Sequence, residues 1–272
     1  MFRLSQGQLN LLTTCPRKFQ HTYIEQLATP YSPEQQEKLA WGSRFHLLMQ
    51  QKELGLPIES IVEGDTEMQR CLNAFIDPEP ELFTLSEKSD RTFRQAEHTR
   101  TLNFQNYLIT VIYDLLIAES KQSQIFDWKT YPRPQNHKSL AQNWQTRLYL
   151  YVLVESSNYL PEQISMTYWF VQLEGENKPQ SLKFPYSETK HEQTRQDLTR
   201  ILDKLTDWLQ RYNDRGEFFP QVEISEGNCY SCQFITRCDR THEIEENPLT
   251  KINAAAPPDW LPNLGMIEEI SI

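Results

Sequence analysis

The sequence lacks the surplus of positive charge that general nucleic-acid-binding proteins carry. Its 272 residues include 27 Lys and Arg but 37 Asp and Glu, which gives a formal net charge of −10 at pH 7. Proteins that bind nucleic acid without sequence preference are normally basic. The composition therefore argues against a protein that binds DNA or RNA through its overall charge alone.

The acidic residues are unevenly distributed along the chain. Residues 239–272 carry a net charge of −5, whereas residues 1–52 carry a net charge of +3. Basic side chains of the N-terminal part are therefore candidates for phosphate contacts, although each could equally be an ordinary solvated charge. The candidates are Arg17, Lys18 and Arg44. The acidic tail could face away from DNA or bind a basic protein partner.

Long apolar runs, internal repeats and low-complexity segments are also missing. No run approaches the roughly 20 apolar residues that span a bilayer, and no signal peptide is visible. We therefore expect no membrane association and a location in the cytoplasm. The apolar fraction is only 38%, but 13 Phe, 12 Tyr and 6 Trp are ample material for the core of one sizeable domain.

Cysteine is scarce, and four of the five cysteines follow a pattern. Cys229, Cys232 and Cys238 form a C-x2-C-x5-C motif, while Cys15 opens a Cys-Pro-Arg-Lys-Phe string near the other end of the chain. Without a signal peptide, and with an odd number of cysteines, disulfides are not expected. Four thiolates suit a [4Fe–4S] cluster or a zinc ion. Cys71, in a helix-like stretch, is expected to be a small buried apolar residue.

Two apolar runs, residues 107–118 and 125–129, are separated by a polar turn, and both carry chemically useful side chains. Their β-branched and aromatic content predicts a β-hairpin. Asp114 lies in the first run, and Asp127 and Lys129 lie in the second, within an Asp-Trp-Lys-Thr string. Because side chains alternate along a strand, Asp127 and Lys129 are predicted to share one face.

These three side chains suit metal-assisted hydrolysis of a phosphodiester. Mg²⁺ binds hard oxygen ligands, so the carboxylates of Asp114 and Asp127 together with a phosphate oxygen would form a suitable site. Lys129 could stabilise charge on the phosphate or help to deprotonate the attacking water. The simpler alternative is an ion pair between Asp114 and Lys129 at the strand ends.

Two earlier segments offer further ligands. Glu97, in a predicted strand at residues 94–104, could supply a third carboxylate. His46 lies in a predicted helix at residues 33–54. A single histidine on a partly apolar helix could also be an ordinary core or surface residue.

A predicted helix at residues 141–156 carries Gln145 and Tyr149 four positions apart on one face. With this helix, the chain resembles the PD-(D/E)XK nuclease superfamily, in the branch of RecB-type, AddB-type and Cas4-type nucleases. The resemblance rests on the order of the motifs: a helical His, a Glu, a strand-end Asp, a D-x-K strand and a Q-x-x-x-Y helix. One departure is Ile112, where many relatives have a glycine two residues before the aspartate.

The resemblance implies a role for each matching residue. It implies that His46, Asp114 and Asp127 bind Mg²⁺ or Mn²⁺, that Lys129 is the catalytic lysine, that Glu97 assists at the metal, and that Gln145 and Tyr149 position DNA or the lysine.

The resemblance also connects the cysteines. AddB-type and Cas4-type nucleases join an N-terminal cysteine to a C-terminal triplet around a [4Fe–4S] cluster. It therefore implies a cluster that staples the chain ends together, held by Cys15, Cys229, Cys232 and Cys238.

For the fold, the resemblance implies an α/β protein with a restriction-endonuclease-like core. Its central mixed sheet would be flanked by helices, with helical N- and C-terminal segments joined by the metal cluster. We expect a nuclease domain over residues 1–245 and a Pro-rich acidic tail over residues 246–272. An N-terminal helix is expected to break and restart at Pro16.

The leading hypothesis is a Mg²⁺- or Mn²⁺-dependent deoxyribonuclease, acting as an exonuclease on single strands or duplex ends in DNA repair or recombination. A second hypothesis is a catalytically silent iron–sulfur DNA-binding or scaffold subunit. Such subunits generally lose an acid or the lysine, and this chain keeps them all. A third hypothesis is a Cas4-like nuclease of spacer acquisition.

Overall fold

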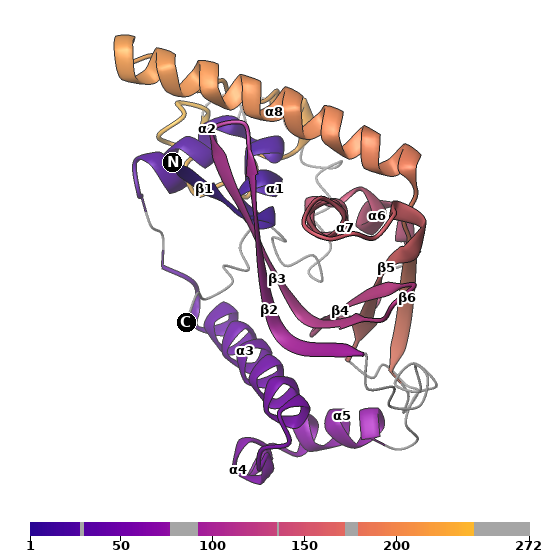
Figure 1. Ribbon diagram of the computed structural model, residues 1–272. Helices are drawn as coiled ribbons and strands as arrows, with labels where there is room; N and C mark the ends of the chain where they lie inside the picture. The colour runs from indigo at the N-terminus through magenta and orange to yellow at the C-terminus, as the bar shows by residue number, and fades with distance from the viewer. Residues whose placement is uncertain (28–29, 77–91, 135, 172–178, 242–272) are drawn as a thin grey trace. The chain divides into compact units, whose positions relative to one another are not determined.

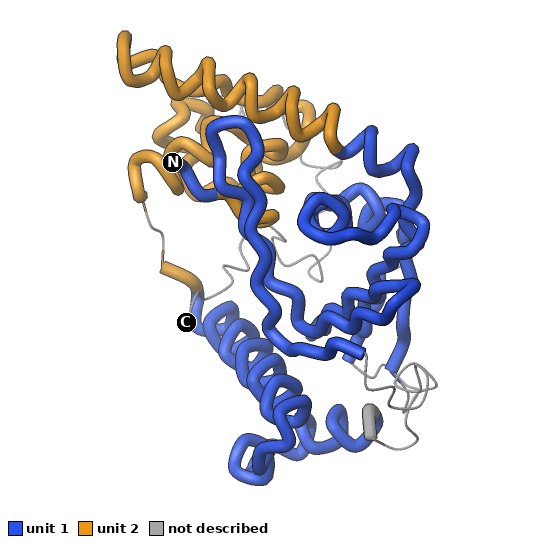
Figure 2. Tube along the Cα trace, in the orientation of Figure 1, with its two compact units in different colours: residues 1–3, 32–194 blue, residues 4–31, 195–272 orange. Residues whose placement is uncertain are grey.

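The structure is a computed structural model that describes residues 1–27, 30–76, 92–134, 136–171 and 179–241 (Figure 1). The chain forms two compact units (Figure 2). Unit 1 comprises residues 1–3 and 32–194, and unit 2 comprises residues 4–31 and 195–272. The predicted tail over residues 246–272 lies outside the described residues.

Unit 1 contains a mixed β-sheet, as predicted. Its strand order is β1-β3-β4-β5-β6, and β2 pairs with β3. Strand β4 runs parallel to β5, whereas the β2–β3, β3–β4 and β5–β6 pairs are antiparallel. The strands are β1 (Phe2–Leu4), β2 (Phe93–Phe104), β3 (Tyr107–Ala118), β4 (Ser123–Lys129), β5 (Ile164–Phe170) and β6 (Gln180–Pro185).

The predicted hairpin is present as the antiparallel pair β3–β4, in which Leu115 lies opposite Phe126. Every residue of β4 is buried because β3 and β5 flank it and helices cover it. The parallel partner β5 requires a crossover, and two helices supply it. These are α6 (His137–Gln142) and α7 (Trp144–Glu155).

The apolar core of unit 1 lies between the sheet and the helices α3 (Pro33–Glu53) and α5 (Thr66–Ile76). Phe126 and Trp128 of β4 belong to this core. Alternation along β4 therefore turns Asp127 and Lys129 to the opposite face, where α7 lies (Figure 1). The short helix α4 (Glu59–Val62) connects α3 to α5.

One predicted helix is divided in two. Residues 141–156 were expected to form a single helix, but α6 ends and α7 begins at Asn143, which has an extended backbone with φ −61° and ψ 142°. The side-chain oxygen of Asn143 accepts a hydrogen bond from the backbone N–H of Gln145 at 2.8 Å. This capping interaction starts the new helix and places Gln145 in its first turn.

Unit 2 combines an early segment and a late segment of the chain. It contains α1 (Gln6–Thr14), α2 (Pro16–Phe19), a π-helical turn (Gln20–Ile24) and most of α8 (Glu188–Arg215). The predicted break at Pro16 is confirmed, because Cys15 is extended and Pro16 begins α2. A 3-10 turn (Ile224–Glu226) precedes the cysteine triplet. Among the described residues, no helix is both long and apolar enough to cross a membrane.

Candidate functional site

Three predicted ligand residues converge in unit 1. One ligand atom from each of His46, Glu97 and Asp114 lies within 4.8 Å of the other two. His46 extends from α3, Glu97 from β2 and Asp114 from β3. An imidazole nitrogen with two carboxylates is a donor set that suits a divalent ion such as Mn²⁺. These residues therefore fit the ion that the motif implies.

Asp114 is oriented by the neighbouring strand. Its Oδ2 accepts a hydrogen bond from the backbone N–H of Trp128 at 2.6 Å, and its Oδ1 lies 3.4 Å from Nδ1 of His46. Burial lowers the pKa of His46, but the carboxylate of Asp114 outweighs this effect and raises the pKa to about 9. The group therefore has an excess of negative charge that attracts a proton, and a metal ion would meet the same field.

Glu97 reaches this group through an unusual backbone. Its φ is +49°, in the left-handed region, although it is not a glycine. The strand register pairs Ala96 with Leu115 and His98 with Tyr113, yet Glu97 and Asp114 are not paired between them. A left-handed non-glycine residue costs roughly 1–3 kcal/mol, and such residues cluster at functional sites. The sheet is thus locally distorted where the two carboxylates meet.

Asp127 and Lys129 form a second, more deeply buried part of the site. Nζ of Lys129 lies 2.5 Å from Oδ1 of Asp127 and donates to Oε1 of Gln145 at 2.7 Å. The amide nitrogen of Gln145 donates in turn to Oδ2 of Asp127 at 2.7 Å. The three side chains therefore form a closed ring of polar contacts. Gln145 thus contacts the lysine, and its role in positioning DNA or the lysine stays a prediction.

The buried charges influence one another strongly. Burial lowers the pKa of Lys129, but Asp127, Tyr131 and Asp114 together outweigh burial and raise the pKa to about 12, so the amine is held as an ammonium ion. Burial raises the pKa of Asp127, and Lys129 opposes that rise. Asp127 is 2% exposed, and its carboxylate is occupied by Lys129 and Gln145. It is not among the three converging residues, so its predicted role as a metal ligand stays a prediction.

Tyr149 lies in the packing between α7 and β3. Its ring is fully buried and meets the ring of Tyr113 edge-on at 5.3 Å, and its carbonyl accepts a hydrogen bond from the Tyr113 hydroxyl at 3.0 Å. These contacts support the helix that carries Gln145.

Two tyrosines near Lys129 were not predicted from the sequence. The ring of Tyr168 lies under the ammonium of Lys129, with 5.0 Å between Nζ and the ring centroid. Tyr131 is 8% exposed, and its hydroxyl is buried. Tyr131 directly follows the Asp-Trp-Lys-Thr string, which was a usable signal. Tyr168 is brought there only by the parallel pairing in which it lies opposite Asp127.

Of the basic side chains, Arg44 belongs to unit 1. Its guanidinium donates to the carbonyl oxygen of Ile61 at 2.7 Å and contacts Asp65 at 3.3 Å. The guanidinium of Arg44 is thus bound to the α4–α5 segment, and its contact with phosphate remains a prediction.

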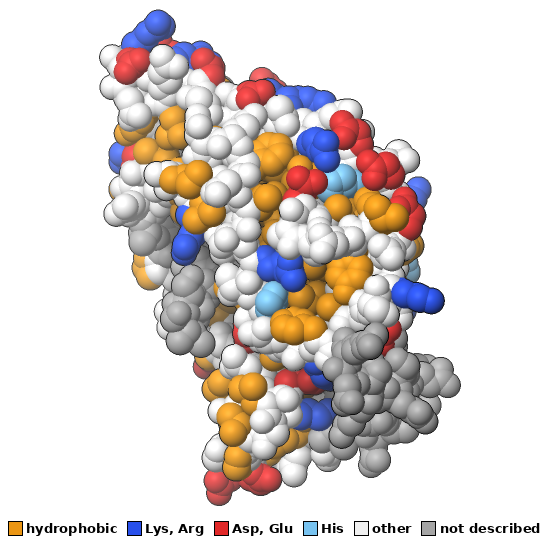
Figure 3. All heavy atoms as spheres, in the orientation of Figure 1, with side chains coloured by type: hydrophobic (Ala, Val, Ile, Leu, Met, Phe, Trp, Pro, Cys, Tyr) orange, Lys and Arg blue, Asp and Glu red, His pale blue; other side chains and the backbone are white. Residues whose placement is uncertain are grey.

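Along α8, basic and acidic side chains are interspersed (Figure 3), as in the pair Arg200–Asp197.

The sequence model of the PD-(D/E)XK nuclease superfamily matches residues 3–239, which is most of the chain. The protein belongs to the PD-(D/E)XK nuclease superfamily. Among solved structures, it is similar to one described as "Putative exonuclease" from Eubacterium rectale. That match has a TM-score of 0.53 and 10% identity and covers 86% of this chain and 87% of the other, which supports the shared fold.

A second match, to the structure of SSO0001, has a TM-score of 0.37 and 12% identity, and covers 85% of this chain and 83% of the other. No curated protein matches this member of the superfamily.

In this PD-(D/E)XK protein, unit 2 contains all four patterned cysteines, each free and partly exposed. Sγ of Cys15 accepts a hydrogen bond from the backbone N–H of Lys18 at 3.4 Å. Burial raises the pKa of the Cys232 and Cys238 thiols, and in both cases Cys15 and Cys229 add to the rise. The thiols that were predicted to act together are therefore near enough to interact.

A closed zinc site sets a standard for how closely cysteine sulfurs gather. With Zn–S bonds of about 2.3 Å, the sulfurs of a tetrahedral site lie about 3.8 Å apart. Over the ranges that the structure describes, the group of ligand atoms within 4.8 Å of one another is the one built on His46. No three of the cysteine sulfurs converge to that degree.

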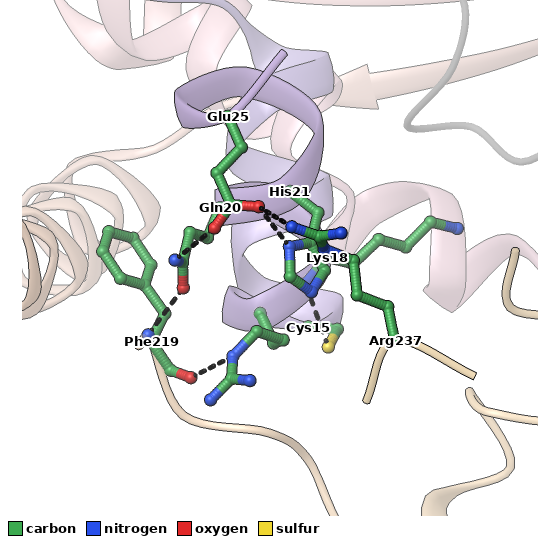
Figure 4. Close-up of polar contacts among 8 residues, drawn as sticks. Cys15, Lys18, Gln20, His21, Glu25, Phe219 and Arg237 are labelled. Carbon is green, nitrogen blue, oxygen red and sulfur yellow. Dashed lines mark hydrogen bonds and ion pairs between the residues drawn. The ribbon is translucent and has the colours of Figure 1, made fainter. Parts of the chain in front are cut away.

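A polar network joins the N-terminal helices to the C-terminal segment in unit 2 (Figure 4). Nε of Arg17 donates to the carbonyl oxygen of Phe219 at 2.6 Å, and Oε1 of Gln20 accepts from the backbone N–H of Phe219 at 2.7 Å. Glu25 then links three side chains: Gln20 at 2.8 Å, His21 at 2.9 Å and Arg237 at 3.4 Å. This network therefore connects the N-terminal helices to Phe219 and Arg237, and the predicted joining by a metal cluster stays a prediction.

Proposed function

We propose that this protein is a divalent-metal-dependent deoxyribonuclease that hydrolyses phosphodiester bonds. The observation that carries the proposal is the convergence of His46, Glu97 and Asp114 beside a buried Lys129 in a chain of the PD-(D/E)XK superfamily. Phosphodiester hydrolysis requires an activated water and a group that stabilises negative charge on the phosphate. The two parts of the site supply these functions separately.

In this mechanism His46, Glu97 and Asp114 would hold Mg²⁺ or Mn²⁺, and Asp127 would complete the ligand set. When bound, the ion supplies Lewis-acid charge and lowers the pKa of a coordinated water. Lys129, kept as an ammonium ion by the neighbouring Asp127, stabilises charge that develops on the phosphate. Gln145 fixes the direction of the lysine, and the Trp128 N–H fixes Asp114.

We propose DNA as the substrate, with exonuclease action on single strands or duplex ends in repair or recombination. The similarity to a structure described as "Putative exonuclease" supports this choice of activity. The net charge of −10 favours a substrate that is bound locally at the site over one bound along a wide basic surface. Products would carry a 5′-phosphate and a 3′-hydroxyl.

We also propose a [4Fe–4S] cluster in unit 2, bound by Cys15, Cys229, Cys232 and Cys238. Four free cysteines in one unit, with thiols that influence one another, support it. The cluster would reinforce the polar network between the chain ends and would have no redox step in the reaction. Free cysteines also suit the reducing cytoplasm.

A nuclease assay with end-labelled single- and double-stranded DNA tests the function. Protein purified without oxygen should cut DNA with Mg²⁺ or Mn²⁺, and both Asp114→Asn and Lys129→Ala should lower the rate by at least about 100-fold. The label pattern would give the polarity of cutting. Full activity in Lys129→Ala would overturn the mechanism, and no cutting by intact wild type would favour a scaffold subunit.

A further inference from the structure

Tyr131 has a hydroxyl group that the fold does not use. The residue follows β4 after Thr130, and its ring packs edge-on against Phe170 of β5 at 5.9 Å. The side chain is more than nine-tenths buried. Within the part of the chain that the structure describes, its Oη has no hydrogen-bond partner. Burying a hydroxyl without a partner is unfavourable, and phenylalanine would fill the same space without that cost.

The unpartnered hydroxyl lies beside the buried lysine. Burial raises the pKa of Tyr131, and the charge of Lys129 opposes that rise. Tyr131 in turn raises the pKa of Lys129. Its effect is smaller than those of burial and Asp127 and larger than the charge effect of Asp114. Lys129 lies opposite Phe170 in the β4–β5 pairing, and the Tyr131 ring packs against that same Phe170, so the two side chains are neighbours at this strand end.

The proposed function makes two demands on Asp127. In the structure its carboxylate is 2.5 Å from Nζ of Lys129 and accepts from Gln145. If Asp127 also binds the metal, its carboxylate interacts with the ion, and its interaction with the Lys129 ammonium becomes weaker. An ammonium group has three hydrogen atoms to donate. Of the described groups, Gln145 accepts one of them and the Tyr168 ring covers another side.

We propose that the Tyr131 hydroxyl is an alternative hydrogen-bond acceptor for Lys129. It would keep the ammonium group in place when Asp127 coordinates the metal. This inference rests on the proposed nuclease function and adds a positioning residue to it. Tyr131 acts through Lys129 and does not contact the phosphate. While Asp127 is paired with Lys129, as it is in the structure, the lysine does not need the hydroxyl.

The first test compares Tyr131→Phe with wild type and with Tyr186→Phe. Tyr186 is also a buried tyrosine of unit 1, so the control loses the same hydroxyl elsewhere. Tyr131→Phe should lower kcat about 10- to 100-fold with KM within twofold, and its melting temperature should not fall. Tyr186→Phe should keep kcat within twofold. A Tyr131→Phe enzyme with wild-type kcat, or with kcat and melting temperature lost together, overturns the proposal.

The second test does not depend on activity. A structure of the wild type with Ca²⁺ or Mn²⁺ bound should place Nζ of Lys129 within hydrogen-bond distance of Oη of Tyr131, with Asp127 on the ion. Asp127 still paired with Lys129 in that structure would overturn the inference while leaving the nuclease proposal intact. If the wild type cuts no DNA with any metal, the proposed function fails, and this structure alone decides the role of Tyr131.

Discussion

At the residue scale, the site depends on one uncharged side chain that satisfies two buried charges. Gln145 uses its carbonyl oxygen for Lys129 and its amide nitrogen for Asp127. No charged residue could serve both partners, because a carboxylate accepts only and an ammonium donates only. The amide therefore sets the distance between the lysine and the acid without adding charge to the site.

Replacing Gln145 by alanine should lower kcat about 10- to 100-fold, as loss of a supporting partner at a metal site does. It should also cost roughly 1–3 kcal/mol of stability, because Lys129 and Asp127 would each lose a buried partner. Gln142→Ala, at an exposed position of α6, is the matched control. Steady-state kinetics and urea unfolding would check both effects, and a Gln145→Ala enzyme with wild-type kcat would contradict this role.

His46 provides a test of the metal group through stability alone. Saturating Mn²⁺, at about 100 times its Kd, should add about 2.7 kcal/mol and raise the melting temperature of the wild type by several degrees. His46→Ala should lose most of that rise, while His137→Ala, at an exposed position of α6, should keep it. An equal rise in all three proteins would mean that the ion binds elsewhere.

At the element scale, the distortion of β2 is the feature that brings a third carboxylate to the ligand group. The register is the same on both sides of Glu97, so the strand contains no inserted residue. The change is confined to the backbone angles of Glu97, whose φ is +49°. A regular strand would keep Glu97 in the pairing with Asp114, so the fold gives up local pairing to present this side chain.

Substitution of Glu97 can separate strain from ligation. Glu97→Gly should be more stable than Glu97→Ala by roughly 1 kcal/mol, because only alanine keeps a Cβ at a positive φ. Both variants should lose metal affinity to a similar extent. Denaturant unfolding and calorimetric titration with Mn²⁺ measure the two quantities. If the alanine variant were the more stable of the two, the left-handed conformation of Glu97 would be disproved.

The elements also show what the sequence could predict. The β3–β4 hairpin was predictable because its signals are local: two apolar runs, a polar turn and alternating side chains. The break at Asn143 was missed because an asparagine inside an apolar helical pattern is ambiguous until its side chain is seen to cap Gln145. The φ of Glu97 and the position of Tyr168 depend on neighbouring strands, and no local pattern records such pairings.

At the scale of the whole molecule, residues 4–31 and the described residues from 195 to 241 belong to one unit, and the cluster proposed within it can be tested through metal content. Cys232→Ala should remove the iron of anaerobically purified protein and lower its melting temperature. Cys71→Ala, in the core of unit 1, should keep the iron although it also loses a thiol. Unchanged melting of Cys232→Ala would refute the staple, and one zinc per chain would refute the iron–sulfur proposal.

The order of the site residues along the chain has a consequence for protein synthesis. Asp114, Asp127 and Lys129 emerge from the ribosome together, but Gln145 follows on α7, and β4 gains its second neighbour only with β5 at Ile164–Phe170. A nascent chain that ends before β5 carries the acids and the lysine without the framework that buries them. We therefore expect the proposed activity to arise only after β5 has been synthesised, so that an interrupted translation product would not cut nucleic acid.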